Sequence, residues 1–458
     1  MSNWVERETA ASSMQDVRHK NRLKKLLRRL SDKPTQSIPA ACQQWCDTLA
    51  AYRFLDNPKV DHRRILSGHK ASTVERIRAH EVVLLVQDTT FLEYGRAHGK
   101  PGFGTMKVTE HEQYLLHPTV AFTPERLNLG VLEVKLWQRP EEQVAHLRGS
   151  KPIEEKESYR WLESYRVACE VQRACPETLI VNVADREGDI HEVFLEATTG
   201  RREEKAEFLI RAKCNRRIAK GDENSYLWEE MRAAPSLGQL AFDLPAAPGR
   251  KARRATLTVK AKRVMFNRAR RPGGMLPPAT VWAVYVKEIK APKGESAIEW
   301  MLLSSVQAED LEQAKRLVDW YRCRWEIELY FRILKQGCRI EQLRLETDQR
   351  LLNGIAVYLI VAWRIHALTM ASRSHPEASC ERFFEQREWQ TIYLMQTRKP
   401  PPKKPPALRT ITRYLAQLGG FLARKHDGEP GTKTIWQGYQ RLNDYMSAIE
   451  LSRIVESR

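Results

Sequence analysis

The chain has 458 residues, which is enough for about two to four domains and at least one sizeable hydrophobic core. Its hydrophobic content of 42% and charged content of 29% are those of an ordinary globular protein. Lysine and arginine number 76 against 57 aspartates and glutamates, a net charge of +19 that favours a polyanionic partner, of which nucleic acid is the commonest. A basic globular protein without such a partner is the alternative on charge alone.

Cysteine spacing and apolar runs exclude several other classes. The eight cysteines include no C-x2-C pair, and Cys42 and Cys46 lack a downstream Cys or His pair, which argues against a zinc site. Unpaired thiols fit a reducing cytoplasm better than secretion. Residues 1–11 have no apolar core, so we expect no signal peptide, and the apolar run at 355–363 is too short to span a bilayer. We therefore expect a soluble cytoplasmic protein without a membrane partner.

The first 75 residues are predicted to be helical and basic. An apolar stripe at helical spacing is formed by Leu23, Leu26, Leu27 and Leu30. Around it crowd the cationic residues Arg18, Lys20, Arg22, Lys24, Lys25, Arg28 and Arg29. Such a pattern suits a helix that lies on DNA phosphates. A solvated helix face and a membrane-surface helix are the alternatives.

An α/β unit is predicted next, with an aspartate at the end of two of its strands. Residues 82–86 are a continuous apolar run, typical of a strand covered on both faces, and Asp88 follows it. Residues 179–184 form a second run of this kind, directly followed by Asp185. Sites in such sheets tend to lie at strand ends, where the two aspartates sit.

The other predicted elements of this unit are a hairpin of strands at 114–122 and 129–137, a helix at 154–172 and a strand at 207–213. Their order predicts a mixed sheet. From about residue 215 to 300 the pattern changes to strand-like runs separated by breaks rich in Pro, Gly and Arg, which predicts an all-β insertion. The runs lie at 239–244, 255–266 and 280–289.

A helix near residue 325 carries the most specific pattern, formed by Tyr321, Arg324, Glu328 and Lys335. At about 100° per residue these positions fall within an arc of about 60°, so we expect all four side chains on one helix face. A carboxylate flanked by an arginine, a lysine and a tyrosine suits a site that binds metal and phosphate together. Beyond it, an apolar helix at 354–370 and a proline- and lysine-rich linker at 399–406 precede short helices.

Three carboxylates complete the candidate site: Asp88, Asp185 and Glu328. Phosphodiester cleavage and strand transfer need an activated nucleophile, a stabilised leaving oxyanion and in-line geometry. Two Mg²⁺ ions about 3.5–4 Å apart, held by carboxylate oxygens, provide all three. Arg324 and Lys335 are expected to contact phosphate oxygens, and Tyr321 to donate a hydrogen bond to one. Each carboxylate alone reads more simply as a turn former or a surface residue, but the joint arrangement is much harder to obtain by chance.

These patterns resemble the DDE transposases of bacterial insertion sequences, in particular the group of the Tn-five and insertion-sequence-four transposases. Four stretches carry the resemblance: Val86-Gln-Asp88-Thr-Thr90; Asp185-Arg-Glu-Gly-Asp-Ile190; Tyr321-x2-Arg324-x3-Glu328-x6-Lys335; and Gly419-Gly-Phe-Leu422 followed by Lys433-Thr-Ile-Trp436. The third matches the Y-R-E-K signature of the family and is highly specific. The similarity runs from about Arg22 to the C-terminus.

The resemblance implies an α/β, ribonuclease-H-like catalytic core interrupted by a mainly antiparallel β insertion and flanked by helical N- and C-terminal domains. The implied domains are 1–75 for DNA binding, 76–365 for catalysis and 366–458 for dimerisation and DNA contact. The triad is implied to bind two Mg²⁺ ions per site, with Mn²⁺ as a substitute. The implied partners are double-stranded DNA, at transposon ends and at the target, and a second copy of the chain in a synaptic homodimer, in a bacterial cytoplasm at the nucleoid.

The family scheme is cut-and-paste excision through a hairpin at each transposon end. Hairpin formation requires a flipped base next to the break, which an aromatic ring can hold by stacking. Trp300 matches the family's tryptophan for this role, and a tryptophan packed in the core is the alternative. Arg211 and Lys213 match basic residues that contact end DNA, with an exposed strand face as the alternative. Residues 13–23 depart from the Leu-Gly-Asp-Lys/Arg-Arg-Leu run that usually opens the family's first helical region, so end specificity stays open.

Two other functions compete with an active transposase. One is a non-catalytic DNA-binding protein that inhibits transposition, and the other is a general metal nuclease. The complete carboxylate set argues against the first, because a binding protein has no need of it. The second does not call for the basic N-terminal and helical C-terminal regions.

Overall fold

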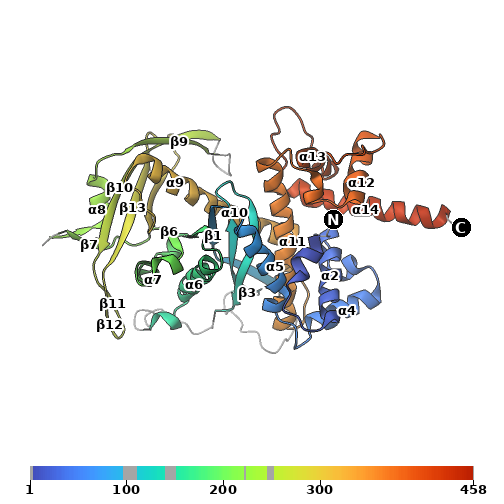
Figure 1. Ribbon diagram of the computed structural model, residues 1–458, viewed down its shortest axis with the longest axis horizontal. Helices are drawn as coiled ribbons and strands as arrows, with labels where there is room; N and C mark the ends of the chain where they lie inside the picture. Colours follow the sequence, from blue (N-terminus) through green and yellow to red (C-terminus); the bar gives the residue numbers. More distant parts are fainter. Residues whose placement is uncertain (1–3, 96–110, 140–150, 221–222, 245–251, 457–458) are drawn as a thin grey trace. The chain divides into compact units, whose positions relative to one another are not determined.

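The computed structural model describes residues 4–95, 111–139, 151–220, 223–244 and 252–456. Contacts divide the chain into two compact units, each discontinuous in sequence. The first comprises Met1–Arg76, Thr89–Glu141 and Glu326–Arg458, and the second comprises Ile77–Asp88 and Glu142–Trp325. The first unit is largely helical, and the second contains most of the strands (Figure 1).

The second unit is built on a mixed sheet with strand order β1-β5-β6-β14-β13-β10-β7-β8, and β9 pairs with β10 (Figure 1). The strands are β1 (Val82–Gln87), β5 (Leu179–Ala184), β6 (Glu207–Arg211), β7 (Arg217–Lys220), β8 (Glu223–Tyr226), β9 (Gly238–Leu244), β10 (Arg253–Phe266), β13 (Ala279–Glu288) and β14 (Glu299–Ser304). β1, β5 and β6 are parallel, whereas β14, β13 and β10 continue the sheet antiparallel. Strands β1 and β5 are buried along nearly their whole length, as central strands covered on both faces are.

Helices and short turns complete the second unit. The helices are α6 (Tyr159–Ala174), α7 (His191–Thr198), α8 (Leu227–Ala233) and α9 (Leu311–Arg322). The 3-10 turns are η2 (Ile153–Glu155), η3 (Arg186–Gly188), η4 (Arg202–Glu204) and η5 (Cys323–Trp325). A two-stranded antiparallel ribbon is formed by β11 (Ala269–Arg271) and β12 (Gly274–Leu276). Helix α6 packs on β5. Gly188, just after β5, lies so close to this layer that an added Cβ would sit 2.6 Å from the Ala184 Cβ. The turn after β5 is thereby held against the sheet.

The first unit combines both ends of the chain with three antiparallel strands. Its N-terminal helices are α1 (Trp4–Ala10), α2 (Val17–Asp32), α3 (Ile38–Cys42), α4 (Trp45–Leu55) and α5 (His62–Ile77). Its strands are β2 (Thr90–Gly95), β3 (His111–Phe122) and β4 (Asn128–Trp137). The C-terminal elements are α10 (Glu326–Arg332), the π-helical turn η6 (Ile333–Gly337), η7 (Ile340–Gln342), α11 (Asp348–Ser374), η8 (Cys380–Arg382), α12 (Gln386–Thr397), α13 (Leu408–Leu418) and α14 (Thr432–Glu456).

Helix α11 forms the core of the first unit. It contacts α2, α4, β4, α13 and α14, and almost all of its residues from Leu351 to Ser372 are buried. Among the described helices it alone is long and apolar enough to cross a membrane, but 94% of that apolar window is buried inside the structure. A helix that is apolar all round and covered by its neighbours is the central helix of a helical domain.

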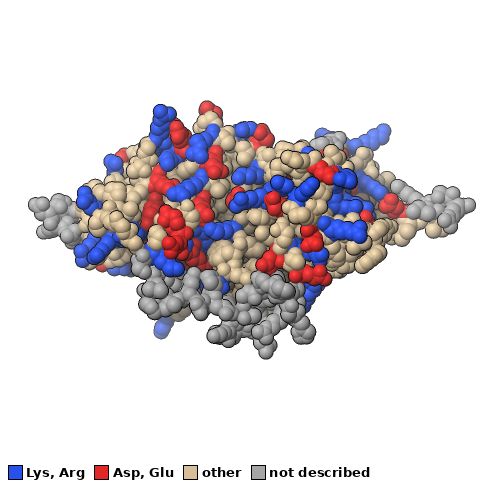
Figure 2. All heavy atoms as spheres, turned by 90° about the horizontal axis from the view of Figure 1, so that it is seen from below, with Lys and Arg blue, Asp and Glu red and all other residues tan. Residues whose placement is uncertain are grey.

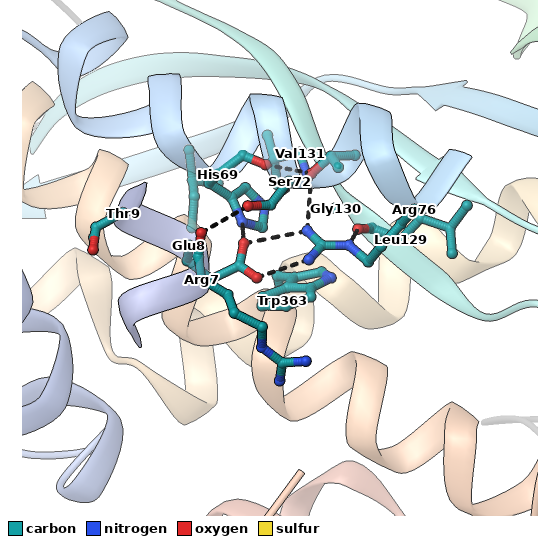
Figure 3. Close-up of polar contacts among 12 residues, drawn as sticks. Arg7, Glu8, Thr9, His69, Ser72, Arg76, Leu129, Gly130, Val131 and Trp363 are labelled. Atoms are coloured by element: carbon teal, nitrogen blue, oxygen red, sulfur yellow. Dashed lines mark hydrogen bonds and ion pairs between the residues drawn. The ribbon is translucent and has the colours of Figure 1, made fainter. Parts of the chain in front are cut away.

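A buried ionic cluster fastens α1 to the rest of the first unit (Figure 3). The Glu8 carboxylate accepts hydrogen bonds from His69 and from Arg76, whose Nη1 lies 2.7 Å from Oε1. The Val131 amide donates to Nε2 of His69 over 3.0 Å, so the ring is neutral and protonated on Nδ1, from which it donates to Glu8. The Arg76 guanidinium stacks 4.4 Å from the Trp363 ring centroid. Helices α1, α5 and α11 and strand β4 are thereby joined.

Most of the predicted elements are confirmed. The strands at 82–86 and 179–184, the antiparallel hairpin and the apolar helix are present as β1, β5, β3–β4 and α11. The predicted insertion is mainly antiparallel, but the expectation that it is all-β is wrong, because it includes α8. Strand β2, which begins two residues after Asp88, was not predicted.

Candidate active site

The two aspartates predicted at strand ends occupy equivalent positions on neighbouring parallel strands. Val86 of β1 lies opposite Val183 of β5, and Asp88 and Asp185 each follow two residues later. Because the carboxyl ends of adjacent parallel strands meet at one edge of a sheet, both carboxylates belong to the same edge. Asp185 also begins η3, since its Oδ1 accepts the Glu187 N–H over 2.8 Å. The prediction that both aspartates end buried strands is confirmed.

Arg324 binds the first of these aspartates. Its Nη1 donates to Oδ2 of Asp88 over 2.9 Å, and the two side chains are only 13% and 20% exposed. Arg324 lies in η5, the 3-10 turn that follows α9. A guanidinium carries five N–H donors in a rigid fork, a geometry that suits carboxylate and phosphate oxygens alike. A predicted phosphate ligand therefore lies directly beside a predicted metal ligand.

Tyr321 and Arg211 belong to the same environment. Tyr321, near the end of α9, is buried, which raises the pKa of its hydroxyl, while Arg324 and Arg211 lower this pKa and Asp185 raises it. Arg211 lies beside Tyr321, and its Nη2 donates to the Glu299 carbonyl oxygen over 3.1 Å. Burial lowers the pKa of Arg211, against the effect of Tyr321. The end of β6 and the end of α9 thus bring an arginine and a tyrosine to the aspartate edge.

Trp300, on β14, lies next to Tyr321. The two ring centroids are 5.4 Å apart with an interplanar angle of 66°, an edge-to-face contact. The indole also stacks on the ring of Phe242 of β9, with centroids 6.3 Å apart and an interplanar angle of 18°. Trp300 is half-buried. It is therefore beside the predicted phosphate ligands and is also packed against its own insertion, so both of its sequence interpretations stay open.

Lys213 is exposed on the segment that leaves β6, and a buried aspartate fixes that segment. Asp189 Oδ2 accepts the backbone N–H groups of Lys213 and Cys214, each over 2.8 Å. Arg216 donates from Nε to Asp189 Oδ1 over 3.1 Å, and the Asp189 side chain is completely buried. Sequence reasoning missed this anchoring role, although Asp189 lies in the quoted stretch that begins at Asp185. A side chain that binds the backbone of a segment more than twenty residues away leaves no periodic pattern in the sequence.

Glu328 and Lys335 lie in the first unit. Glu328 is half-buried on α10. Lys335 lies in the π-helical turn η6, where its Nζ is 3.4 Å from Oε1 of Glu341. Gly337 in the same turn packs against Trp436, with 2.9 Å between an added Cβ and the indole ring. The quoted C-terminal motif thus supports the turn that carries Lys335.

The expectation of one uniform α-helix through Tyr321, Arg324, Glu328 and Lys335 is wrong, and a common face for the four side chains stays a prediction. The α-helix ends at Arg322, and the chain continues as 3-10 turn, α10 and π-helical turn. A 3-10 turn advances about 120° per residue and a π-turn less than an α-helix does, so a uniform angle does not describe this segment. Within this segment, Arg324 of the 3-10 turn binds Asp88, and α10 begins with the buried residue Glu326.

Glu326 was not predicted from the sequence and holds α10 in place. It is almost completely buried, and its Oε1 accepts a hydrogen bond from Arg126 Nη1 over 3.2 Å. Its Oε2 lies 3.4 Å from His366 Nε2 on α11. A buried carboxylate is tolerated only with such partners. The helix that presents Glu328 is therefore anchored two residues earlier by Glu326.

The donor set fits a divalent cation in its chemistry. Asp88 and Asp185 present carboxylate oxygens at one sheet edge, and such oxygens are the ligands that Mg²⁺ and Mn²⁺ prefer. Within the described ranges, no group of three or more His, Cys, Asp or Glu side chains is placed to hold a metal ion. Glu328 belongs to the other unit. The three-carboxylate site therefore stays a prediction.

Three family models each match a different part of the chain, and residues 61–198 lie outside all three. Residues 1–60 match a transposase DNA-binding model, residues 199–364 a transposase DDE domain, and residues 360–457 a Tn5 transposase dimerisation domain. Among solved structures, the chain is similar to the cryo-EM structure of the piggyBac transposase synaptic complex with hairpin DNA. That match has 10% sequence identity and a TM-score of 0.31, and it covers 80% of this chain and 57% of that chain. The match therefore spans little more than half of the piggyBac protein, and the TM-score is too low to define a common topology.

Proposed function

We propose that this chain, which belongs to the DDE transposases of the Tn5 type, excises and integrates an insertion sequence by cleaving and joining DNA at its two ends. The observation that carries the proposal is the pair Asp88 and Asp185, at equivalent ends of parallel strands, with Arg324 bound to the first. This arrangement supplies carboxylates for metal and a guanidinium for phosphate within one sheet edge.

The proposed fold assignment is a ribonuclease-H-like core in residues 76–365, with the β insertion at about 215–300. Residues 1–75 would bind the transposon end, and residues 366–458 would pair two copies in a synaptic dimer. The parallel strands β1, β5 and β6 and their packed helix support the core assignment. On the face drawn in Figure 2, basic side chains alternate with acidic ones, so the net charge of +19 does not by itself mark the DNA surface.

Asp88, Asp185 and Glu328 would hold two Mg²⁺ or Mn²⁺ ions. When bound, such ions lower the pKa of a nucleophilic water or hydroxyl and stabilise the leaving oxyanion. The side chains around them have separate tasks. Arg324 and Lys335 neutralise non-bridging phosphate oxygens, and the Tyr321 hydroxyl donates a hydrogen bond to one of them.

Two further basic residues would contact the DNA of the transposon end. Arg211, held beside Tyr321, and Lys213, on the exposed segment fixed by Asp189, extend the contacts along the end DNA. The backbone of Arg211 is fixed in β6 and that of Lys213 by Asp189, so DNA binding does not have to order this segment.

The proposed reaction has four displacements at phosphorus. Water attacks at the transposon end, and the bridging oxygen leaves as a 3′-hydroxyl. That hydroxyl attacks the opposite strand, which closes the transposon end as a hairpin and releases the flanking DNA. A second water opens the hairpin and regenerates the 3′-hydroxyl, which then attacks the target. Each step exchanges one phosphodiester oxygen for another and needs no external energy source. Trp300 would stack on the base that leaves the duplex during hairpin formation.

The test is an assay of purified protein with Mg²⁺ and the DNA of its own element ends, resolved on a denaturing gel. The proposal predicts hairpinned ends that appear after a first-strand nick. Nicks without hairpins would instead support a general metal nuclease. Tight binding without any cleavage would support a non-catalytic inhibitor of transposition.

A further inference from the structure

Phe242 lies between Trp300 and an arginine that the sequence signature does not include. Its ring is nearly parallel to the Trp300 indole, with centroids 6.3 Å apart and an angle of 18°. The Cζ atom of Arg322 also lies over the Phe242 ring, 4.1 Å from its centroid. These three side chains come from β9, β14 and α9 of the same unit, and β9 is far in sequence from the other two elements.

Each member of this stack is fixed by its own element. Phe242 is 8% exposed and sits opposite Ala255 in the β9–β10 pairing. Trp300 sits opposite Val286 in the β13–β14 pairing. Arg322 is held at the end of α9 by Asp319, whose Oδ1 accepts from Nη1 over 3.0 Å. The stack therefore joins two strand pairings to the helix that ends beside Arg324.

The two arginines that flank Cys323 serve different partners. Arg324 binds the Asp88 carboxylate, whereas Arg322 lies over an aromatic ring, within the distance at which cation–π attraction is effective. Tyr321, directly before Arg322, contacts the edge of Trp300. The end of α9 thus supports the indole in two ways: Tyr321 contacts it directly, and Arg322 contacts the Phe242 ring on which the indole stacks.

We propose that Phe242 and Arg322 form a buttress that holds the Trp300 indole in the orientation in which it receives the base unstacked beside the break. This inference rests on the proposed function, because it assigns Trp300 to base stacking. An aromatic platform binds a base with less loss of conformational freedom if its plane is fixed beforehand. Phe242 is therefore a positioning residue for hairpin formation, and it has no task in the first nick.

The experiment uses the full chain with end DNA that carries 2-aminopurine beside the break, in Mg²⁺ and under single-turnover conditions. Phe242→Leu keeps an apolar side chain and removes the ring, and Phe242→Tyr restores a ring. Arg322→Gln removes the cation without opening the core. The matched control is Trp228→Leu, a half-buried tryptophan of the same insertion that contacts Tyr285 instead.

For Phe242→Leu we expect first-strand nicking at the wild-type rate, a hairpin step slower by about tenfold, and a smaller change in 2-aminopurine fluorescence. Phe242→Tyr should recover both signals, Arg322→Gln should weaken them, and Trp228→Leu should match wild type. Wild-type hairpin formation by Phe242→Leu overturns the buttress, and so does an equal loss of nicking and hairpin formation.

Trp300→Ala separates this inference from the proposed function. If Trp300→Ala blocks hairpins and Phe242→Leu does not, the buttress is wrong while the role of Trp300 holds. If Trp300→Ala forms hairpins normally, base stacking by Trp300 is wrong, and so is the proposed role of Phe242 and Arg322.

Discussion

The Nη1 atom of Arg324 lies 2.9 Å from Oδ2 of Asp88, and 236 positions of sequence separate the two residues. The contact connects the turn after α9 to the end of β1. A guanidinium fixed in this way is already placed beside the carboxylate edge when a phosphate arrives. Such preorganised charges contribute most where they face charge that develops in the reaction.

Replacing Arg324 by Gln should therefore slow cleavage far more than it weakens DNA binding. Loss of one preorganised donor to a reacting oxyanion costs about 10²–10³ in rate. Single-turnover cleavage and a filter-binding titration, run on the same end DNA, measure the two effects. Arg332→Gln, an exposed arginine of α10, is the matched control. A variant of Arg324 that loses binding and cleavage in parallel would show that the arginine acts as a general DNA contact.

Trp45 should contribute to recognition of the transposon end. It is the first residue of α4 and is 76% exposed. Two residues further on, the buried carboxylate of Asp47 forms ion pairs with basic side chains of α2, among them Lys25 and Arg22. An exposed aromatic next to several cations suits stacking on a nucleotide beside the phosphate backbone.

Trp45→Ala is expected to raise the dissociation constant for end DNA about tenfold, because one lost stack costs about 1–3 kcal/mol. Fluorescence anisotropy with labelled end DNA measures the change. Leu394→Ala, an exposed apolar residue of α12, is the control. Equal affinities of Trp45→Ala and wild type would remove Trp45 from the DNA surface.

The end of α14 should belong to the dimer interface. Leu451 and Val455 are 64% and 73% exposed, and their spacing of four residues places them on one helix face. They lie within the region that matches the Tn5 dimerisation domain. The double variant Leu451→Asp/Val455→Asp is expected to shift the protein towards monomers in sedimentation velocity with end DNA. Unchanged sedimentation would place the interface elsewhere in residues 366–458.

The cluster of Glu8, His69 and Arg76 predicts acid sensitivity of the first unit. Burial lowers the pKa of His69 below its usual 6.5, although Glu8 opposes this effect. The unfolded chain therefore takes up a proton near pH 6.5 that the folded chain does not. Stability is fully present above that pH and is lost as pH falls, by up to about 1.4 kcal/mol per pH unit. Glu8 adds the same sign at lower pH, because His69 and Arg76 outweigh its burial and hold its pKa below the usual value.

The free energy of unfolding of His69→Gln should therefore depend less on pH than that of wild type between pH 7 and pH 5. Urea titrations at several pH values give the difference between the two proteins, in which the contributions of groups that do not contact His69 cancel. His426→Gln, an exposed histidine, should keep the wild-type slope. Parallel slopes for His69→Gln and wild type would contradict a neutral, buried His69.

The strand-end aspartates were predictable because an unbroken apolar run followed by a carboxylate is a local signal. Asp88 and Asp185 needed no knowledge of the rest of the chain. The change of helix type after Arg322 was not predictable, because the neighbouring side chains meet partners that are distant in sequence, Asp88 for Arg324 and Arg126 for Glu326. Phe242 was missed for the same reason. An alternating strand shows which side chains face inward but not which distant ring they meet.

Glu328→Gln is the most direct test of the proposed active site. The variant removes the negative charge of the carboxylate, replaces one of its oxygens by an amide nitrogen and keeps the side-chain shape. We predict that it binds end DNA like wild type and produces neither nicks nor hairpins in Mg²⁺, while Glu312→Gln, a mostly exposed glutamate of α9, cleaves normally. Cleavage by Glu328→Gln at the wild-type rate would contradict the three-carboxylate site.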